Sequence, residues 1–333
     1  MNLPAAIDRI VSDLGGDRPI QDTEASELVL KTFVRNLLQS DDPGSMSLAA
    51  RVLAGAGLIP KIKSYAIKAA NPTGYAIFLQ EPGAGFSFQR HPTSKVELVH
   101  ILSPRGASRV FKMPYERWRA TVDDQRMRKW LAGGIDEELE RFTVRPQPGD
   151  VFTVETTNDV HTVLGCFLEE FASNSGDMVE RLYDQNDGRI TPPHLTSNYM
   201  HRMLAELPDV TPLRFWHLSP DGWWHEPIHA QETSGITAWQ APCGPLLARW
   251  LRFAASARTV VSPKPGNVLF ARITKGAAQV TLHHEGHSDR FELASGRCLV
   301  LFPNQEAELL DDGSGCLGIS VHEAPIVTAL ASD

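Results

Sequence analysis

The first part of the chain repeats apolar side chains with the period of an α-helix. Apolar residues at positions 6, 7, 10, 11 and 14 form one stripe along residues 5–14, which a pair of glycines ends. Comparable stripes follow over residues 23–38 and 45–58. The pattern predicts three amphipathic helices, and we expect residues 1–65 to form a helical cap that packs against the rest of the chain. A module that binds another protein is the alternative.

From Tyr75 the pattern changes to short β-rich runs separated by proline or glycine. These runs predict strands over residues 75–79, 96–102, 108–111, 151–154 and 163–171. Residues 113–142 interrupt them with aromatic side chains at mixed spacing, which predicts one or two inserted helices. We therefore expect a first β-barrel over residues 66–190 that carries a helical insertion.

The last third of the chain repeats the rhythm of a barrel. The pattern predicts strands over residues 266–273, 278–283 and 296–303. The hairpin that begins at Gly296 resembles the earlier one that begins at Gly149. Residues 191–333 are therefore predicted to form a second barrel, and the chain as a whole is predicted to be mainly β.

Length and charge narrow the classes of function. The chain has 333 residues, of which 42% are hydrophobic, and this suffices for a large core and two or three domains. Its formal net charge is −8 and it has no dense cluster of lysine and arginine, so neither nucleic acid nor an anionic membrane is an expected partner. A small-molecule substrate fits this composition better, and a homodimer stays open as an assembly.

The cysteine pattern and the N-terminal sequence indicate the cellular compartment in which the protein is expected. Cys166, Cys243, Cys298 and Cys316 form no C-x-x-C pair, which indicates neither a thiolate zinc site nor a disulfide framework. The N-terminus lacks a basic start followed by an apolar stretch, and no apolar run approaches the length of a membrane span. We therefore expect a cytoplasmic protein.

One stretch of the first predicted barrel carries a candidate metal site. Gln89 and His91 are two residues apart, so both side chains point to one face of a strand, and Glu97 lies six residues further on. His161 follows from a separate hairpin. An amide, two imidazoles and a carboxylate form a suitable ligand set for a divalent metal. For His91 taken alone, a hydrogen-bonded core histidine is the alternative.

Several blocks of the sequence, in this order, resemble the cupin superfamily and, more narrowly, the type I phosphomannose isomerases. The blocks are Gln89-Arg90-His91-Pro92, Lys95-Val96-Glu97, Pro148-Gly149-Asp150 with His161, Glu170, Asn174-Ser175-Gly176-Asp177 and Arg181-Leu182-Tyr183-Asp184. Together they span roughly residues 86–189. The resemblance implies a mainly β fold of two cupin jelly-roll barrels, preceded by the N-terminal helical segment.

The resemblance also implies an activity, namely a metal-dependent isomerase that interconverts an aldose and a ketose on a sugar or sugar phosphate. The ligands that it implies for one zinc ion are Gln89, His91, Glu97 and His161. It further implies three catalytic residues: Lys95 near the reacting carbons, Glu170, and Arg181 over the substrate oxygens. For Arg181, an ion pair with a nearby aspartate is the alternative.

Departures from the isomerase pattern leave other functions open. Only Thr93 and Ser94 stand where the family has a long insertion, and Gly176 lengthens the Asn-Ser-Asp motif. No Arg-Pro-Trp-Gly occurs near the N-terminus. The alternative is a mononuclear non-haem iron cupin oxygenase acting on a small metabolite, because two histidines and one carboxylate with open positions suit iron(II). A third hypothesis is a cupin that binds a small metabolite without catalysis.

Histidines in the second half of the chain are weaker candidates for metal binding. The position that corresponds to the metal-binding histidine falls within residues 304–307, which contain no histidine, so the second barrel is predicted to be degenerate and metal-free. The segment 225–229 matches the zincin pattern H-E-x-x-H, but Pro227 is incompatible with the continuous helix which that chemistry needs. We expect a strand or loop there, and a solvated hairpin tip at residues 283–287.

Overall fold

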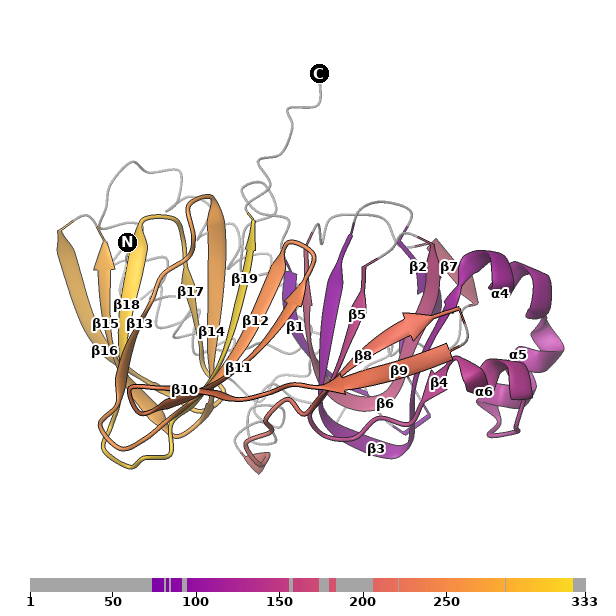
Figure 1. Ribbon diagram of the computed structural model, residues 1–333, viewed down its shortest axis with the longest axis horizontal. Coiled ribbons are helices and arrows are strands. Elements are labelled where there is room, and N and C mark those ends of the chain that lie inside the picture. The colour runs from indigo at the N-terminus through magenta and orange to yellow at the C-terminus, as the bar shows by residue number, and fades with distance from the viewer. Residues whose placement is uncertain are drawn as a thin grey trace, which may run out of the picture.

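The computed structural model describes residues 74–80, 82–83, 85–91, 95–155, 158–173, 180–183, 206–220, 222–284 and 286–325. Within these ranges the chain forms two β-barrels that lie side by side, and three short helices project from the first (Figure 1). The predicted fold class, mainly β with two jelly-roll barrels, is confirmed. The predicted N-terminal helical cap lies outside the described residues.

The first barrel is a nine-stranded sheet in the order β7-β2-β6-β3-β5-β8-β9, with β1 added to β6 and β4 added to β3. Its strands are β1 (Gly74–Leu79), β2 (Phe88–Arg90), β3 (Glu97–Pro114), β4 (Thr143–Val144), β5 (Asp150–Val154), β6 (Asp159–Ala172), β7 (Glu180–Tyr183), β8 (Arg214–Ser219) and β9 (Gly222–Pro227). The sheet extends past residue 190, the predicted domain boundary, because β8 pairs in parallel with β5.

Two long strands, β3 and β6, form the centre of the first barrel. They pair antiparallel from Glu97 opposite Ala172 to Pro114 opposite Asp159, and the register shifts twice along the way. Such irregularities bend a strand pair and increase its twist, which lets the sheet curl into a barrel. Gly165 lies at the bend with a φ of +63°. Because glycine has no Cβ, it adopts this conformation without strain.

The insertion predicted within residues 113–142 contains three short helices, α4 (Tyr115–Thr121), α5 (Asp124–Leu131) and α6 (Glu137–Arg141). Aspartates at positions 123 and 136 cap α5 and α6 by accepting hydrogen bonds from backbone N–H groups of the first turn. The helices cover a buried aromatic cluster in which Trp118 stacks on Phe88. In the part of the chain that the structure describes, no helix is long and apolar enough to cross a bilayer.

The second barrel consists of a six-stranded sheet, β10-β11-β12-β19-β14-β17, and a four-stranded sheet, β13-β18-β15-β16. Its strands are β10 (Gln231–Thr233), β11 (Ile236–Cys243), β12 (Leu246–Phe253), β13 (Arg258–Val261), β14 (Asn267–Lys275), β15 (Ala277–His284), β16 (His287–Ala294), β17 (Cys298–Leu301), β18 (Gln305–Asp311) and β19 (Gly318–Pro325). Its interior is apolar, and buried leucines such as Leu269 and Leu299 fill it. Gln305 accepts a hydrogen bond from the Phe302 amide, which is a structural role.

The two weaker histidine segments both lie on strands. His225 lies on strand β9, so the zincin pattern does not form a helix there, as expected. His284 pairs with His287 at the tip of the β15–β16 hairpin, as predicted, but His284 is buried and not solvated, because its Nδ1 lies 3.3 Å from the backbone oxygen of Asn304. Neither segment therefore reproduces the ligand arrangement of the first barrel.

Candidate metal centre

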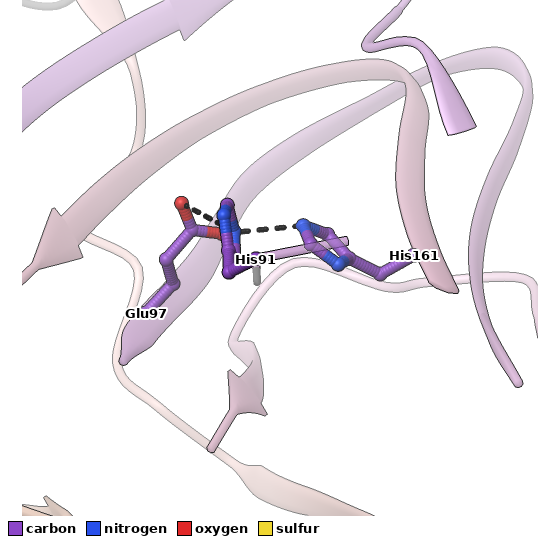
Figure 2. Close-up of side chains that lie close together, drawn as sticks. All are labelled: His91, Glu97 and His161. Atoms are coloured by element: carbon purple, nitrogen blue, oxygen red, sulfur yellow. Dashed lines mark ion pairs between the residues drawn. The ribbon is translucent and has the colours of Figure 1, made fainter. Parts of the chain in front are cut away.

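Three of the four predicted metal ligands converge inside the first barrel (Figure 2). His91 follows β2 directly, Glu97 begins β3, and His161 lies on β6. One ligand atom from each side chain lies within 4.8 Å of the other two, and all three side chains are buried. Barrel closure therefore brings together two segments that are about seventy residues apart in the sequence.

The separations between these atoms suit a common metal ion. Nε2 of His91 lies 3.2 Å from Oε1 of Glu97, and Nε2 of His161 lies 3.4 Å from Oε2 of the same carboxylate. Two atoms that each lie about 2.1 Å from one ion are separated by about 3.0–3.4 Å when the angle between them is about 90–110°. The observed distances fall in this range.

The imidazoles themselves indicate the same site. The ring nitrogens of His91 and His161 are buried, and none of them makes a hydrogen bond of good geometry with a described residue. Burying a polar atom without a hydrogen bond costs free energy of folding unless another group binds that atom. Burial lowers the pKa of His161 even though Glu97 opposes the shift, so its imidazole is neutral and can bind a metal. The donor set therefore fits a divalent ion.

Gln89, the fourth predicted ligand, lies next to this cluster. It is directly opposite His161 in the β2–β6 register, so both side chains lie on the same face of the sheet. Its Oε1 lies 3.5 Å from the hydroxyl of Ser87, and the side chain is half-buried. Its role as a ligand remains a prediction.

Lys95 contributes the positive charge nearest to the candidate ligands. Its ammonium contacts Oε1 of Glu97, and the lysine side chain is buried. Burial alone would raise the pKa of Glu97, but Lys95 and His91 together hold it well below its usual range. Glu97 is therefore ionised. In the absence of a metal, Lys95 supplies its counter-charge.

We expect Lys95→Met to raise metal affinity about tenfold, which corresponds to about 1.4 kcal/mol. The substitution removes a cation that repels a metal ion and competes for the same carboxylate oxygen. Titration of the purified protein against a competing chelator measures this affinity. Lys129→Met removes an exposed lysine and should leave the affinity unchanged. Weaker binding by the Lys95 variant would show that the ammonium supports the metal site instead.

A small cavity of about 20 Å³ lies beside Glu97 and His161. Its volume is enough for one or two water-sized molecules, since each needs about 10–15 Å³ on this measure. The wall is mostly apolar, with Phe86, Val99, Val110, Phe152, Val163 and Trp223 among its side chains. The candidate ligands therefore face a small, largely apolar space.

The remaining predicted catalytic residues differ in their distance from this space. Glu170 lies in the cavity wall together with Glu97 and His161. Arg181 is exposed on β7, where its Nε donates to the hydroxyl of Ser87 at 3.0 Å, and it does not contribute to the cavity wall. The structure thus brings Glu170 to the candidate site and leaves Arg181 at the surface beside it.

Lys112 is a wall residue that the sequence patterns did not identify. It lies directly opposite His161 in the β3–β6 register and is buried. Its ammonium donates to the carbonyl oxygen of Thr153 at 3.0 Å and lies 3.2 Å from Oδ2 of Asp159. The sequence does contain a signal for this residue, because Lys112 lies in an otherwise apolar run over residues 110–113. A charged side chain at an inward-facing strand position requires a buried partner.

Comparison with known proteins finds similarity of architecture only. No protein-family model matches the sequence, and no curated protein matches it. Oxalate decarboxylase from Bacillus subtilis aligns with a TM-score of 0.46 and 13% identity over 77% of this chain and 68% of that chain. A salicylate 1,2-dioxygenase variant from Pseudoaminobacter salicylatoxidans, in complex with gentisate, aligns with a TM-score of 0.46 and 14% identity over 78% and 70%. Similarity at this level transfers no residue role and no substrate.

Proposed function

We propose that the protein is a mononuclear non-haem iron(II) oxygenase that acts on a small metabolite. The proposal rests on His91, Glu97 and His161, which form a set of two histidines and one carboxylate around a common point. This ligand set leaves coordination positions open and is typical of iron(II) enzymes. When bound, iron(II) supplies those positions for dioxygen and for a substrate oxygen.

The observation that carries the proposal is the apolar cavity beside these ligands. Dioxygen is small and apolar, and the cavity of about 20 Å³ offers an apolar wall and room for a molecule of that size. A sugar phosphate is large, polar and doubly charged, so it would leave many of its groups without partners against Val99, Phe152 and Trp223. The polarity of the wall therefore favours dioxygen over the groups of a sugar phosphate.

The chain's own side chains have separate roles in this proposal. Burial lowers the pKa of His161 and so keeps that imidazole neutral, and Glu97 is ionised, so its carboxylate brings one negative charge that partly offsets a divalent ion. Glu170 is the second carboxylate of the wall, and we assign to it the uptake of a proton from the bound substrate. The apolar side chains exclude water from the small space beside the candidate ligands, which has room for a molecule of the size of dioxygen.

A zinc-dependent aldose–ketose isomerase is the second candidate. The contact between Lys95 and Glu97 favours it, because the resemblance implies a lysine near the reacting carbons. The nearness of Gln89 to His161 also favours it, since a fourth protein ligand leaves fewer open positions. The native metal distinguishes the two candidates.

The test is the metal and oxygen chemistry of the purified protein. We expect iron to copurify, and we expect the iron(II) form to bind nitric oxide, which reports open positions on the ion by electron paramagnetic resonance. Oxygen uptake should then depend on a small apolar metabolite from a screened panel. Stoichiometric zinc, no oxygen uptake and proton exchange on an aldose phosphate would overturn the oxygenase and support the isomerase.

A further inference from the structure

A buried polar network joins the two barrels, and Glu169 lies at its centre. Glu169 lies on β6, and 1% of the residue is exposed. One carboxylate oxygen, Oε1, lies 2.9 Å from Nδ1 of His100 on the neighbouring strand β3. The other, Oε2, accepts a hydrogen bond from Nε of Arg272 at 3.0 Å. Arg272 belongs to β14 of the second barrel, so a buried ion pair crosses the junction.

Three further groups of the second barrel surround the same carboxylate. Nε1 of Trp250 on β12 lies 3.4 Å from Oε1, and the hydroxyl of Ser320 on β19 lies 3.4 Å from Oε2. Nε2 of His322, also on β19, lies 3.7 Å from Oε1. Phe171 and Phe270 pack nearby with ring centroids 5.9 Å apart. The junction is therefore buried and polar at its centre, with aromatic packing beside it.

The charges in this network balance only while both imidazoles are neutral. Burial would raise the pKa of Glu169, but Arg272 and the two histidines lower it well below its usual range, so the carboxylate is ionised. Arg272 neutralises that single charge. Cys298 on β17 is also close, and burial raises the pKa of its thiol, so it adds no charge. A proton on either His100 or His322 leaves a net positive charge in the interior.

The surroundings of His322 oppose that proton, because its ring is fully buried and packs against Phe171 and Trp250. For His322, burial lowers the pKa although Glu169 opposes the shift. The closed junction therefore excludes protons that an open, hydrated junction would bind.

We propose that the junction between the two barrels is an acid-sensitive latch, closed when His322 is neutral and opened when it takes up a proton. An imidazole with a lowered pKa contributes full stability above its ordinary value of about 6.5 and loses it as the pH falls below that value. The contribution of Glu169, whose pKa is also lowered, persists to lower pH. Opening should therefore begin below about pH 6.5 and grow up to about tenfold per pH unit for each proton bound.

A buried thiol reports the state of the latch. Cys243 ends β11 in the second barrel, is fully buried, and its Sγ lies 3.5 Å from the backbone oxygen of Glu97 in the first barrel. Cys316 is exposed and reports the intrinsic reactivity of a thiol, whereas Cys166 lies in the core of the first barrel and reports unfolding of that barrel. The ratio of Cys243 to Cys316 labelling therefore measures opening of the junction.

The experiment labels the full-length protein with a pyridyl disulfide, which reacts at acidic pH, and locates the label by mass spectrometry. Between about pH 7.5 and about pH 5.5 we expect the Cys243 to Cys316 ratio to rise by up to about tenfold while Cys166 stays protected. The double variant His100→Gln/His322→Gln should keep a flat ratio. His225→Gln removes an exposed histidine and should behave as the wild type.

Three results would overturn the latch: a flat ratio in the wild type, a rise of Cys166 in parallel with Cys243, or an unchanged rise in the double variant. If the double variant does not fold, the single variant His322→Gln decides. Its ratio should stay flat, because the imidazole that takes up the proton has been removed. An unchanged slope in that variant contradicts the proposal.

Discussion

Replacing His161 with alanine is expected to weaken metal binding at least about a hundredfold, which corresponds to about 2.8 kcal/mol. Its Nε2 lies 3.4 Å from Glu97 and makes no hydrogen bond of good geometry with a described residue, so metal binding is the function that its position supports. His91→Ala should have the same effect, because its Nε2 lies at 3.2 Å from the same carboxylate. Loss of either histidine leaves an incomplete ligand set.

Competition with a chelating dye measures the affinity, and thermal unfolding with and without added metal shows whether the variant is folded. The matched control is His225→Ala, which removes an exposed imidazole from β9 of the same barrel. Binding by the control should equal that of the wild type. Wild-type affinity in a folded His161→Ala variant would show that this imidazole is not a ligand.

The second large effect concerns the junction. Arg272→Met should lower the free energy of unfolding by about 3–5 kcal/mol, because it leaves the Glu169 carboxylate buried without its guanidinium partner. Only 4% of the Arg272 side chain and 1% of the Glu169 side chain are exposed, so water cannot replace the lost partner. Urea unfolding near neutral pH, followed by circular dichroism, measures the change.

Two variants show whether the charge or the packing is responsible. Arg258→Met breaks an ion pair with Glu308 on the surface of the same barrel, where the two side chains are 75% and 36% exposed, and should cost at most about 1 kcal/mol. Adding Glu169→Gln to Arg272→Met removes the unpaired charge and should restore most of the lost stability. A double variant as unstable as Arg272→Met would assign the loss to packing of the arginine side chain.

The barrels were predictable from the sequence because strand signals are local. β-branched runs bounded by glycine and proline indicated β3, β5, β6, β14 and β15, and the structure contains a strand at each position. Local periodicity was sufficient for these strands. The even spacing of Gln89 and His91 also predicted a shared strand face, but β2 ends at Arg90 and His91 lies just beyond it, so that shared face stays a prediction.

Long-range pairing explains what the sequence did not reveal. Glu169 and Glu170 are adjacent on β6, yet one lies in the junction with Arg272 and the other in the cavity wall, because successive strand residues point to opposite faces. Strand periodicity predicts which residues share a face of the sheet, but it does not predict which residues of other strands that face contacts. Arg272 is 103 residues from Glu169, and Lys112 meets His161 only through the β3–β6 register.

The claim that His91, Glu97 and His161 bind one iron ion is tested by the metal content of the purified wild-type protein, measured beside that of Glu97→Gln. We expect about one iron per chain in the wild type and a marked loss in the variant, since a neutral amide binds a cation more weakly than a carboxylate does. X-ray absorption should show only nitrogen and oxygen ligands, at about 2.0–2.2 Å. A wild-type protein that binds no divalent metal after reconstitution, or equal occupancy in Glu97→Gln, would contradict the claim.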